Sequence, residues 1–457
     1  MDISAGIHYS VWWISYIIYI EVFITKVFSY ITKEYFLMKT KQLSISIILF
    51  AWLAYLFSYM GRANYGACIV EIVATTGVSR ATAGMVTSVF SLFNSFGQIG
   101  SGFLLKKVHP VKIIAAELFI VASINLLFPA SNSFVIMALL WGINGAMQST
   151  LLCSATKIFM ETLKEPWLSK GAVMLNTVGA VGGTLNYVLT WFLIRYATWQ
   201  TVFFTVSSIL FAAGILWVIF MPKFTASASG QSAKASKSTD AKDSARKTAA
   251  PASTAGKTSL LSQLTRYGAA FMLAGCFMIG LMRESVSLWI PSYINEVFGL
   301  SSSLSIILTV FVPGFQVFGA ILGGRLGRKM QNLHFPGCVV FAISGFCMGM
   351  LLLAGDFNPF LSVGLFVINA ICMTAALTLS LSLFPIRFLA KEHAPMFVGI
   401  LNFFVHAGDF FASAGIGWLS QYSGWGITFT ILCTIAFTAS VVYAVGGIYC
   451  KRELERR

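Results

Sequence analysis

Long apolar stretches alternate with short polar segments along almost the whole chain. Each stretch reaches the length of about 18 residues or more at which an α-helix can cross the hydrocarbon core of a membrane. We therefore predict an all-α integral membrane protein with twelve transmembrane helices. The predicted spans are residues 43–73, 83–105, 111–129, 133–158, 170–194, 200–221, 267–297, 302–324, 335–354, 359–386, 394–420 and 426–449.

The composition supports this class and orients the chain. Hydrophobic residues make up 57% of the 457 positions and charged residues only 10%, against about 25% charged in soluble proteins. Loops after even-numbered helices, together with the C-terminal tail, hold 23 Lys and Arg, whereas the opposite loops hold two, Arg80 and Arg195. This asymmetry predicts a cytoplasmic C-terminus. The net charge of +15 is then a topology signal, and without a soluble basic domain we expect no nucleic-acid binding.

A polar segment divides the helices into two groups of six. Residues 222–265 are dominated by Ala, Ser, Thr and Lys, a composition that cannot bury a core and predicts a disordered cytoplasmic linker. It separates an N-terminal six-helix bundle, 42–221, from a C-terminal bundle, 266–450, which is followed by a cytoplasmic tail, 451–457.

The first 41 residues do not fit the even helix count. They are apolar and aromatic but interrupted by Glu21 and Lys26. We interpret residues 1–41 as an N-terminal extension, with Met38 opening the functional chain. The alternative is an interfacial amphipathic helix.

The two bundles resemble each other in sequence, which indicates two repeats of the same orientation. Such a repeat is the architecture of secondary transporters that rock one half against the other. Related pieces are Gly77-Val-Ser79 with Gly299-Leu-Ser301, Phe96-Gly97 with Phe318-Gly319, Lys106-Lys107 with Arg328-Lys329, and Tyr196-x-x-Trp199-x-x-x-Phe203 with Tyr422-x-x-Trp425-x-x-x-Phe429.

Each bundle carries one arginine deep in its first helix, Arg62 and Arg283. At 1.5 Å per residue they lie about 24 to 28 Å along their helices, so both are well inside the membrane and should face each other between the bundles. Two guanidinium groups at one cavity form a site for a dianion, because each pairs bidentately with phosphate or carboxylate. The alternative is that each arginine forms a structural ion pair.

Further polar side chains lie near these arginines in sequence. Asn64 and Tyr65 are candidates to donate hydrogen bonds to a bound anion, and Tyr59 shares a face with Arg62; tyrosines in membrane helices also serve packing. Gln98, on the second helix, is a neutral candidate to line the cavity.

Three ionisable side chains suggest proton transfer or ligand contact. His406 and Asp409 share a face of the eleventh helix, and Glu284 follows Arg283 directly. A pair that only holds helices together is the alternative for His406 and Asp409. The sequence contains no zinc-type cysteine spacing, phosphate-binding loop or hydrolase motif, so we predict no metal, no cofactor and no enzyme activity.

The repeat and two motifs resemble a known family. The 6+6 organisation and GGRLGRK at 323–329 resemble the major facilitator superfamily. YMGRANYG and LMRESVSLWIPSYINEVFGLS resemble its organophosphate:phosphate antiporters, the glycerol-3-phosphate and hexose-phosphate carriers. The matching positions are Tyr59, Arg62, Asn64, Tyr65, Leu281, Arg283, Trp289, Pro291, Tyr293 and Glu296. In that family the two arginines bind the phosphoryl group.

Two positions depart from the family pattern. Gln98 replaces a lysine, and Val178 or a neighbour replaces a histidine, which favours a less charged anion or a different phosphate ester. The resemblance implies a monomeric transporter in a bacterial inner membrane, surrounded by lipid, that exchanges a phosphate ester for inorganic phosphate. The alternatives are a proton-coupled symporter of a carboxylate or sugar acid, and a transporter-like sugar-phosphate sensor.

Overall fold

The computed structural model of the chain is helical throughout its described part, with no strand in that part. Eleven of its helical segments are long and apolar enough to cross a membrane. Helix α3 (Arg80–Lys107) occupies the one remaining predicted span, 83–105, and is richer in Ser, Asn and Gln. All twelve predicted spans thus coincide with helices. The structure describes residues 40–131, 133–164, 166–239, 266–388 and 394–455.

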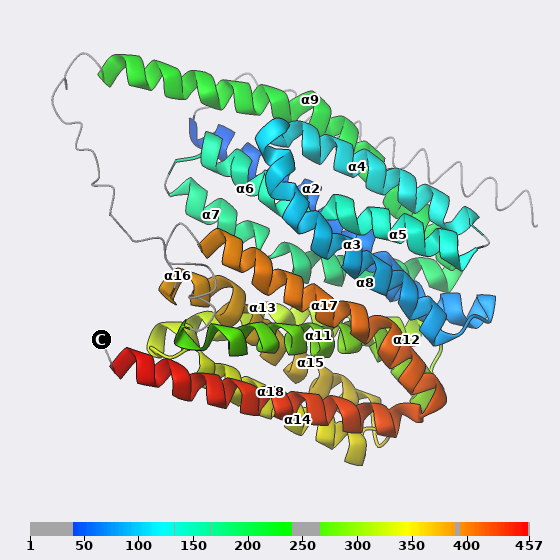
Figure 1. Cartoon of the computed structure of the whole chain (residues 1–457). Coiled ribbons are helices and arrows are strands. Elements are labelled where there is room, and N and C mark those ends of the chain that lie inside the picture. Colours follow the sequence, from blue (N-terminus) through cyan, green and yellow to red (C-terminus); the bar gives the residue numbers. More distant parts are fainter. Residues whose placement is uncertain (1–39, 132, 165, 240–265, 389–393, 456–457) are drawn as a thin grey trace, which may run out of the picture.

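The chain folds into two halves that lie one above the other in Figure 1. The N half, residues 40–239, is coloured blue to green, and the C half, residues 266–455, is coloured green to red. The N half contains α2 (Thr40–Thr76), α3, α4 (Pro110–Leu127), η2 (Phe128–Ala130), α5 (Phe134–Gln148), α6 (Leu151–Thr162), α7 (Trp167–Leu175), α8 (Val178–Tyr196) and α9 (Trp199–Thr239).

The C half repeats this plan. A 3₁₀ turn precedes its first long helix, and a π-helical turn interrupts its fourth span. Its elements are η3 (Arg266–Gly268), α11 (Ala269–Phe298), α12 (Ser302–Thr309), α13 (Phe311–Lys329), α14 (His334–Ala354), α15 (Pro359–Leu377), η4 (Thr378–Leu383), α16 (Phe384–Phe388), α17 (Ala394–Tyr422) and α18 (Gly424–Glu455).

The predicted sequence repeat has a structural counterpart at the first turn of each half. Gly77 and Gly299 both end a first helix with positive φ, 67° and 63°, which glycine adopts without steric cost. Two residues later, Ser79 and Ser301 cap the next helix: their hydroxyls accept hydrogen bonds from Thr82 N at 3.1 Å and Leu304 N at 3.3 Å. The same local chemistry therefore builds the same corner twice.

The predicted linker differs from the structure at its start. Helix α9 does not end at residue 221 but continues through Pro222 to Thr239. Phe224 is buried and its ring packs on Phe50, with centroids 5.3 Å apart, so side-chain packing extends the helix past the apolar span. Residues 240–265 lie outside the described residues. So does the segment before Thr40, on which both hypotheses for the N-terminal extension depend.

The halves meet most closely along α3 and α17. The Ser88 hydroxyl donates to Phe410 O at 2.6 Å, and a Cβ on Gly84 would collide with the carbonyl of Ser413. Small side chains thus let the two backbones touch, which is how membrane helices gain packing energy.

At one end of this contact lies a polar cluster of Arg80, Glu296, Gln421 and Trp425. We call the end of the molecule that carries this cluster the Arg80 end. Arg80, on α3, forms an ion pair with Glu296 of α11, and its backbone N–H donates to Gln421 Oε1 at 2.8 Å. Trp425 Nε1 donates to Glu296 Oε2 at 2.8 Å. The cluster therefore links the N half to three helices of the C half.

We expect Glu296→Gln to loosen the Arg80 end. The Arg80 and Glu296 side chains are 15% and 36% exposed, and an ion pair of this kind contributes about 1 kcal/mol at most. Its loss should lower the ratio of molecules in which the two halves touch at this end to molecules in which they are apart by up to about fivefold. Spin labels at Thr76 and Tyr422, one in each half, measure the opening as a longer-distance population in pulsed electron paramagnetic resonance. The control Glu455→Gln removes an exposed pair with Lys451 and should change nothing; unchanged distances in Glu296→Gln would contradict the prediction.

Candidate functional site

A cavity lies between the two halves, at the middle of the long helices. Its empty volume is about 910 Å³, counted with the solvent space at its mouth. Both predicted arginines line it, Arg62 from α2 and Arg283 from α11. The structure therefore brings together two side chains that are 221 positions apart in sequence. The other polar lining residues are Tyr59, Thr87, Ser91, Trp141, Tyr187, Glu284, Ser287, Thr309 and Gln316.

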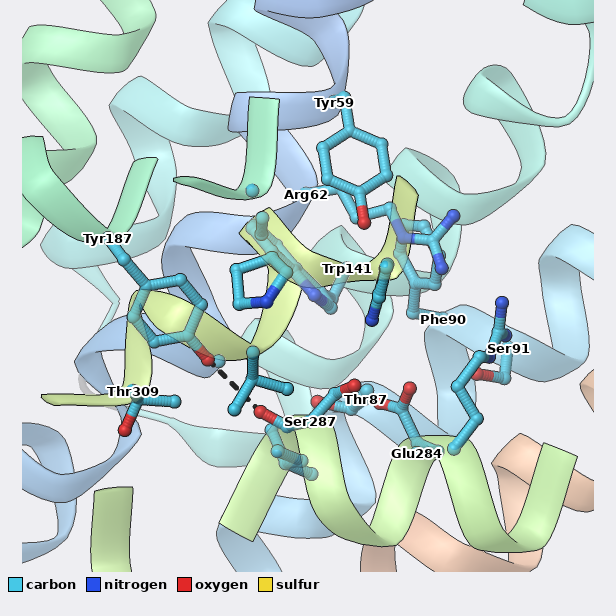
Figure 2. Close-up of a pocket in the computed structure, with 18 residues that line it drawn as sticks. Tyr59, Arg62, Thr87, Phe90, Ser91, Trp141, Tyr187, Glu284, Ser287 and Thr309 are labelled. Carbon is cyan, nitrogen blue, oxygen red and sulfur yellow. Dashed lines mark hydrogen bonds between the residues drawn. The ribbon is translucent and has the colours of Figure 1, made fainter. Parts of the chain in front are cut away.

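Arg62 lies among aromatic rings. Its guanidinium carbon is 5.6 Å from the ring centroid of Tyr59 and 5.1 Å from that of Phe90, distances at which an aromatic face attracts a cation. Figure 2 shows the Tyr59 hydroxyl and the Arg62 guanidinium on the same side of the cavity. Within the described ranges no carboxylate lies within ion-pairing distance of Arg62. Its planar set of donors is therefore free to take up a ligand.

Arg283 is held by a carboxylate. Its Nη2 donates to Asp409 Oδ2 at 2.6 Å, where Asp409 is 1% exposed and the arginine side chain 24% exposed. The alternative of structural ion pairing thus applies to Arg283, although its side chain also reaches the cavity. One guanidinium edge positions the group, and the exposed part remains available to an anion.

A chain of hydrogen bonds continues from Asp409 across the boundary between the halves. His406 Nδ1 lies 2.9 Å from Asp409 Oδ2, and its Nε2 lies 3.1 Å from Nε2 of Gln98 on α3. Because the Gln98 amide nitrogen can only donate, His406 Nε2 accepts and the ring proton sits on Nδ1, facing Asp409. Asn402 also donates to Gln98 Oε1. This chain couples Arg283 to the N half.

Three of the predicted ligand contacts lie away from the cavity. Asn64 is buried and donates to Asn125 Oδ1 at 2.7 Å. The Tyr65 hydroxyl donates to Ala83 O at 2.6 Å. Gln98 belongs to the hydrogen-bond chain just described. Helix geometry explains the placement of Asn64. Its side chain is rotated about 200° around the helix axis from that of Arg62 and therefore points into the N half.

Several side chains at the site were not among the residues predicted from the sequence. Tyr187, on α8, lines the cavity and donates its hydroxyl to Ser287 O at 3.0 Å, a contact drawn in Figure 2. Thr309 also lines the cavity. Arg80, which links the halves outside the cavity, was likewise not predicted to do so. The available signal was weak, since each is a single polar residue within or at the edge of an apolar segment.

Two similar six-helix halves around a charged central cavity define a membrane carrier of the alternating-access class. The chain belongs to the Major Facilitator Superfamily, whose family model matches residues 51–388. The predicted superfamily and fold are thereby confirmed.

The relatives agree with the predicted resemblance. The probable hexose phosphate transport protein of Chlamydia trachomatis serovar D is 24% identical over 411 residues, covering 86% of this chain and 88% of the relative. The glycerol-3-phosphate transporter of Bacillus subtilis is 22% identical over 421 residues, covering 89% and 92%. A solved structure of the peptide transporter POT in complex with sulfate superposes with a TM-score of 0.68 at 12% identity, covering 91% of this chain and 99% of that one; this likeness concerns the fold alone.

Proposed function

We propose that the protein transports a small organic anion by alternating access, and that its substrate is a phosphate ester exchanged for inorganic phosphate. One observation carries the proposal: arginines from opposite halves line a single cavity at the middle of the membrane helices. Unpaired charge is expensive at that depth, and the relatives include transporters named for hexose phosphate and glycerol-3-phosphate.

A bound phosphoryl group would connect the two halves. Its oxygens accept hydrogen bonds from Arg62 on one side and from the exposed part of Arg283 on the other. Such a ligand binds the conformation in which both groups reach it more tightly than one in which they are apart, and this difference in affinity drives the change of state.

The pairing of Arg283 with Asp409 bears on why the carrier would exchange substrates rather than return empty. Two unpaired arginines would repel each other in an empty carrier, but of these two only Arg62 lacks an ion-pair partner within the described ranges. The empty protein then carries a guanidinium without an ion-pair partner between states. We propose that this guanidinium makes exchange faster than return of the empty carrier.

The orientation follows from the basic loops. If the end bearing Lys106, Lys107, Arg328 and Lys329 faces the cytoplasm of a bacterial cell, the Arg80 end faces outward. An ion pair and hydrogen bonds join the two halves at the Arg80 end, and we propose that this conformation is closed to the outside of the inner membrane.

Flux into proteoliposomes tests the proposal. We expect vesicles loaded with inorganic phosphate to take up labelled glycerol-3-phosphate or glucose-6-phosphate, whereas vesicles loaded with chloride should take up neither. Exchange requires internal phosphate because the loaded carrier crosses faster than the empty one. Protein-free vesicles are the control.

The same vesicles separate the alternative functions. The hydrogen-bonded Asp409 and His406 beside the cavity favour proton-coupled symport as the second candidate. Uptake that follows an imposed pH gradient and needs no internal phosphate would identify it and contradict exchange. Saturable ligand binding without flux would identify a sensor.

A further inference from the structure

We propose that the substrate carries a protonated amino group in addition to its anionic group, and that Glu284 binds this ammonium. The inference rests on the proposed function, because it narrows the phosphate ester to an amino-bearing one. It starts from a carboxylate that the proposed phosphate contacts do not use.

Glu284 reaches the cavity from the C half. It lines the cavity beside Arg283, and Figure 2 shows its carboxylate pointing from α11 into the open space. Neighbouring positions on a helix point about 100° apart, so the guanidinium of Arg283 is directed elsewhere, to Asp409 at 2.6 Å. In the described parts of the chain, Glu284 has no ion-pair partner.

The charges around the cavity balance without a ligand. When both carboxyl groups are ionised, the two positive charges of Arg62 and Arg283 are matched by the two negative charges of Glu284 and the buried Asp409. A dianionic phosphate ester would leave this group with an excess of negative charge and would approach Glu284 with the same sign. An ester that also carries an ammonium group adds less negative charge to the cavity and places its positive charge beside the carboxylate of Glu284.

The remaining free partners are arranged for a molecule with opposite charges at its two ends. Arg62 belongs to the N half and Glu284 to the C half, and each lacks an ion-pair partner within the residues described. A ligand with phosphate at one end and ammonium at the other would satisfy both groups and would bridge the halves. Ser91 and Ser287 also line the cavity, and their hydroxyls would supply hydrogen bonds to a polar body between these ends.

Three sugar phosphates that differ at one substituent test this inference. Glucose-6-phosphate carries a hydroxyl, glucosamine-6-phosphate a protonated amine, and N-acetylglucosamine-6-phosphate an uncharged amide at the same carbon. Uptake into phosphate-loaded vesicles is measured for each with wild type and with Glu284→Gln, which keeps the shape and removes the charge. In wild type we expect the KM of the amino ester to be about tenfold below that of the other two.

The variant should lose this preference. With Glu284→Gln we expect the three KM values to agree within about twofold, while glucose-6-phosphate is still transported. Glu161→Gln is the matched control, because Glu161 lies in an exposed pair with Lys157 and should leave the wild-type preference unchanged.

Each other outcome has a defined meaning. Equal KM values in wild type would overturn the inference alone. A Glu284→Gln variant that slows all three esters equally would show that Glu284 serves the conformational change, and would also overturn it. If no phosphate ester is transported, glycerol-3-phosphate included, the proposed function fails and the inference fails with it.

Discussion

Arg62→Lys and Arg283→Lys are each expected to lower phosphate-ester exchange by about 100-fold. Lysine keeps the positive charge but replaces the planar fork, which holds two phosphate oxygens at once, by a single point donor. The loss should be seen mainly as a raised KM for Arg62→Lys, since Arg62 is the cavity arginine without an ion-pair partner in the described residues. Exchange in proteoliposomes at varied substrate concentration measures both the KM and the maximal rate.

The two arginine variants should differ in stability. Arg283 donates to the buried Asp409, and lysine keeps the positive charge but loses the planar guanidinium that makes this contact, so part of the stabilisation of the pair is lost. Arg283→Lys should therefore also unfold at lower temperature, whereas Arg62→Lys should not. Arg195→Lys, an exposed change at the end of α8, is the control for both. Wild-type exchange in Arg62→Lys would contradict the assignment of this residue to the site.

Gly408→Leu is expected to prevent α11 and α17 from packing together. A Cβ on Gly408 would collide with the carbonyl of Phe277, and a Cβ on Gly280 would collide with that of Val405, so the two backbones are in direct contact. A leucine there forces the helices apart at a cost of about 3 kcal/mol, and it displaces Asp409 from Arg283. We expect loss of monodisperse protein in size-exclusion chromatography.

A matched glycine on the same helix controls this prediction. Gly415 lies seven residues further along α17, and nothing lies within 4 Å of a Cβ built there. Gly415→Leu should therefore behave like wild type in the same measurement. If both leucine variants elute as monodisperse protein, the close contact of α11 with α17 is not needed for folding.

The spans and their repeat were predictable because their causes are local. A run of apolar residues reaches the length of a membrane helix whatever surrounds it. The Gly-x-Ser corner builds a turn from its own backbone freedom and its own hydroxyl, and so it recurs at Gly77 and at Gly299. The end of α9 was predicted too early. Packing of Phe224 on Phe50 stabilises the helix beyond the apolar span, and composition alone does not predict this contact.

The depth of the arginines was also predictable, and their surroundings were not. Counting residues along a regular helix gives the height of Arg62 and Arg283 in the membrane, and both do line one cavity. The partner of Arg283 is Asp409, 126 positions away. From the sequence, Asp409 could be linked only to His406, three positions away on the same helix. Its pairing with Arg283 could not be predicted, because a contact between helices depends on which helices pack side by side.

The sequence by itself determined where the predicted spans lie, the repeat, the superfamily resemblance and the presence of one arginine in the first long helix of each half. Only the tertiary structure decided which side of each helix faces the cavity. It turned Asn64 and Tyr65 inward, placed Gln98 in a hydrogen-bond chain, and left Glu284 beside the open space. The physical reason is that apolarity and helical rise set position along a helix axis, whereas rotation about that axis is set by the packing of neighbouring helices.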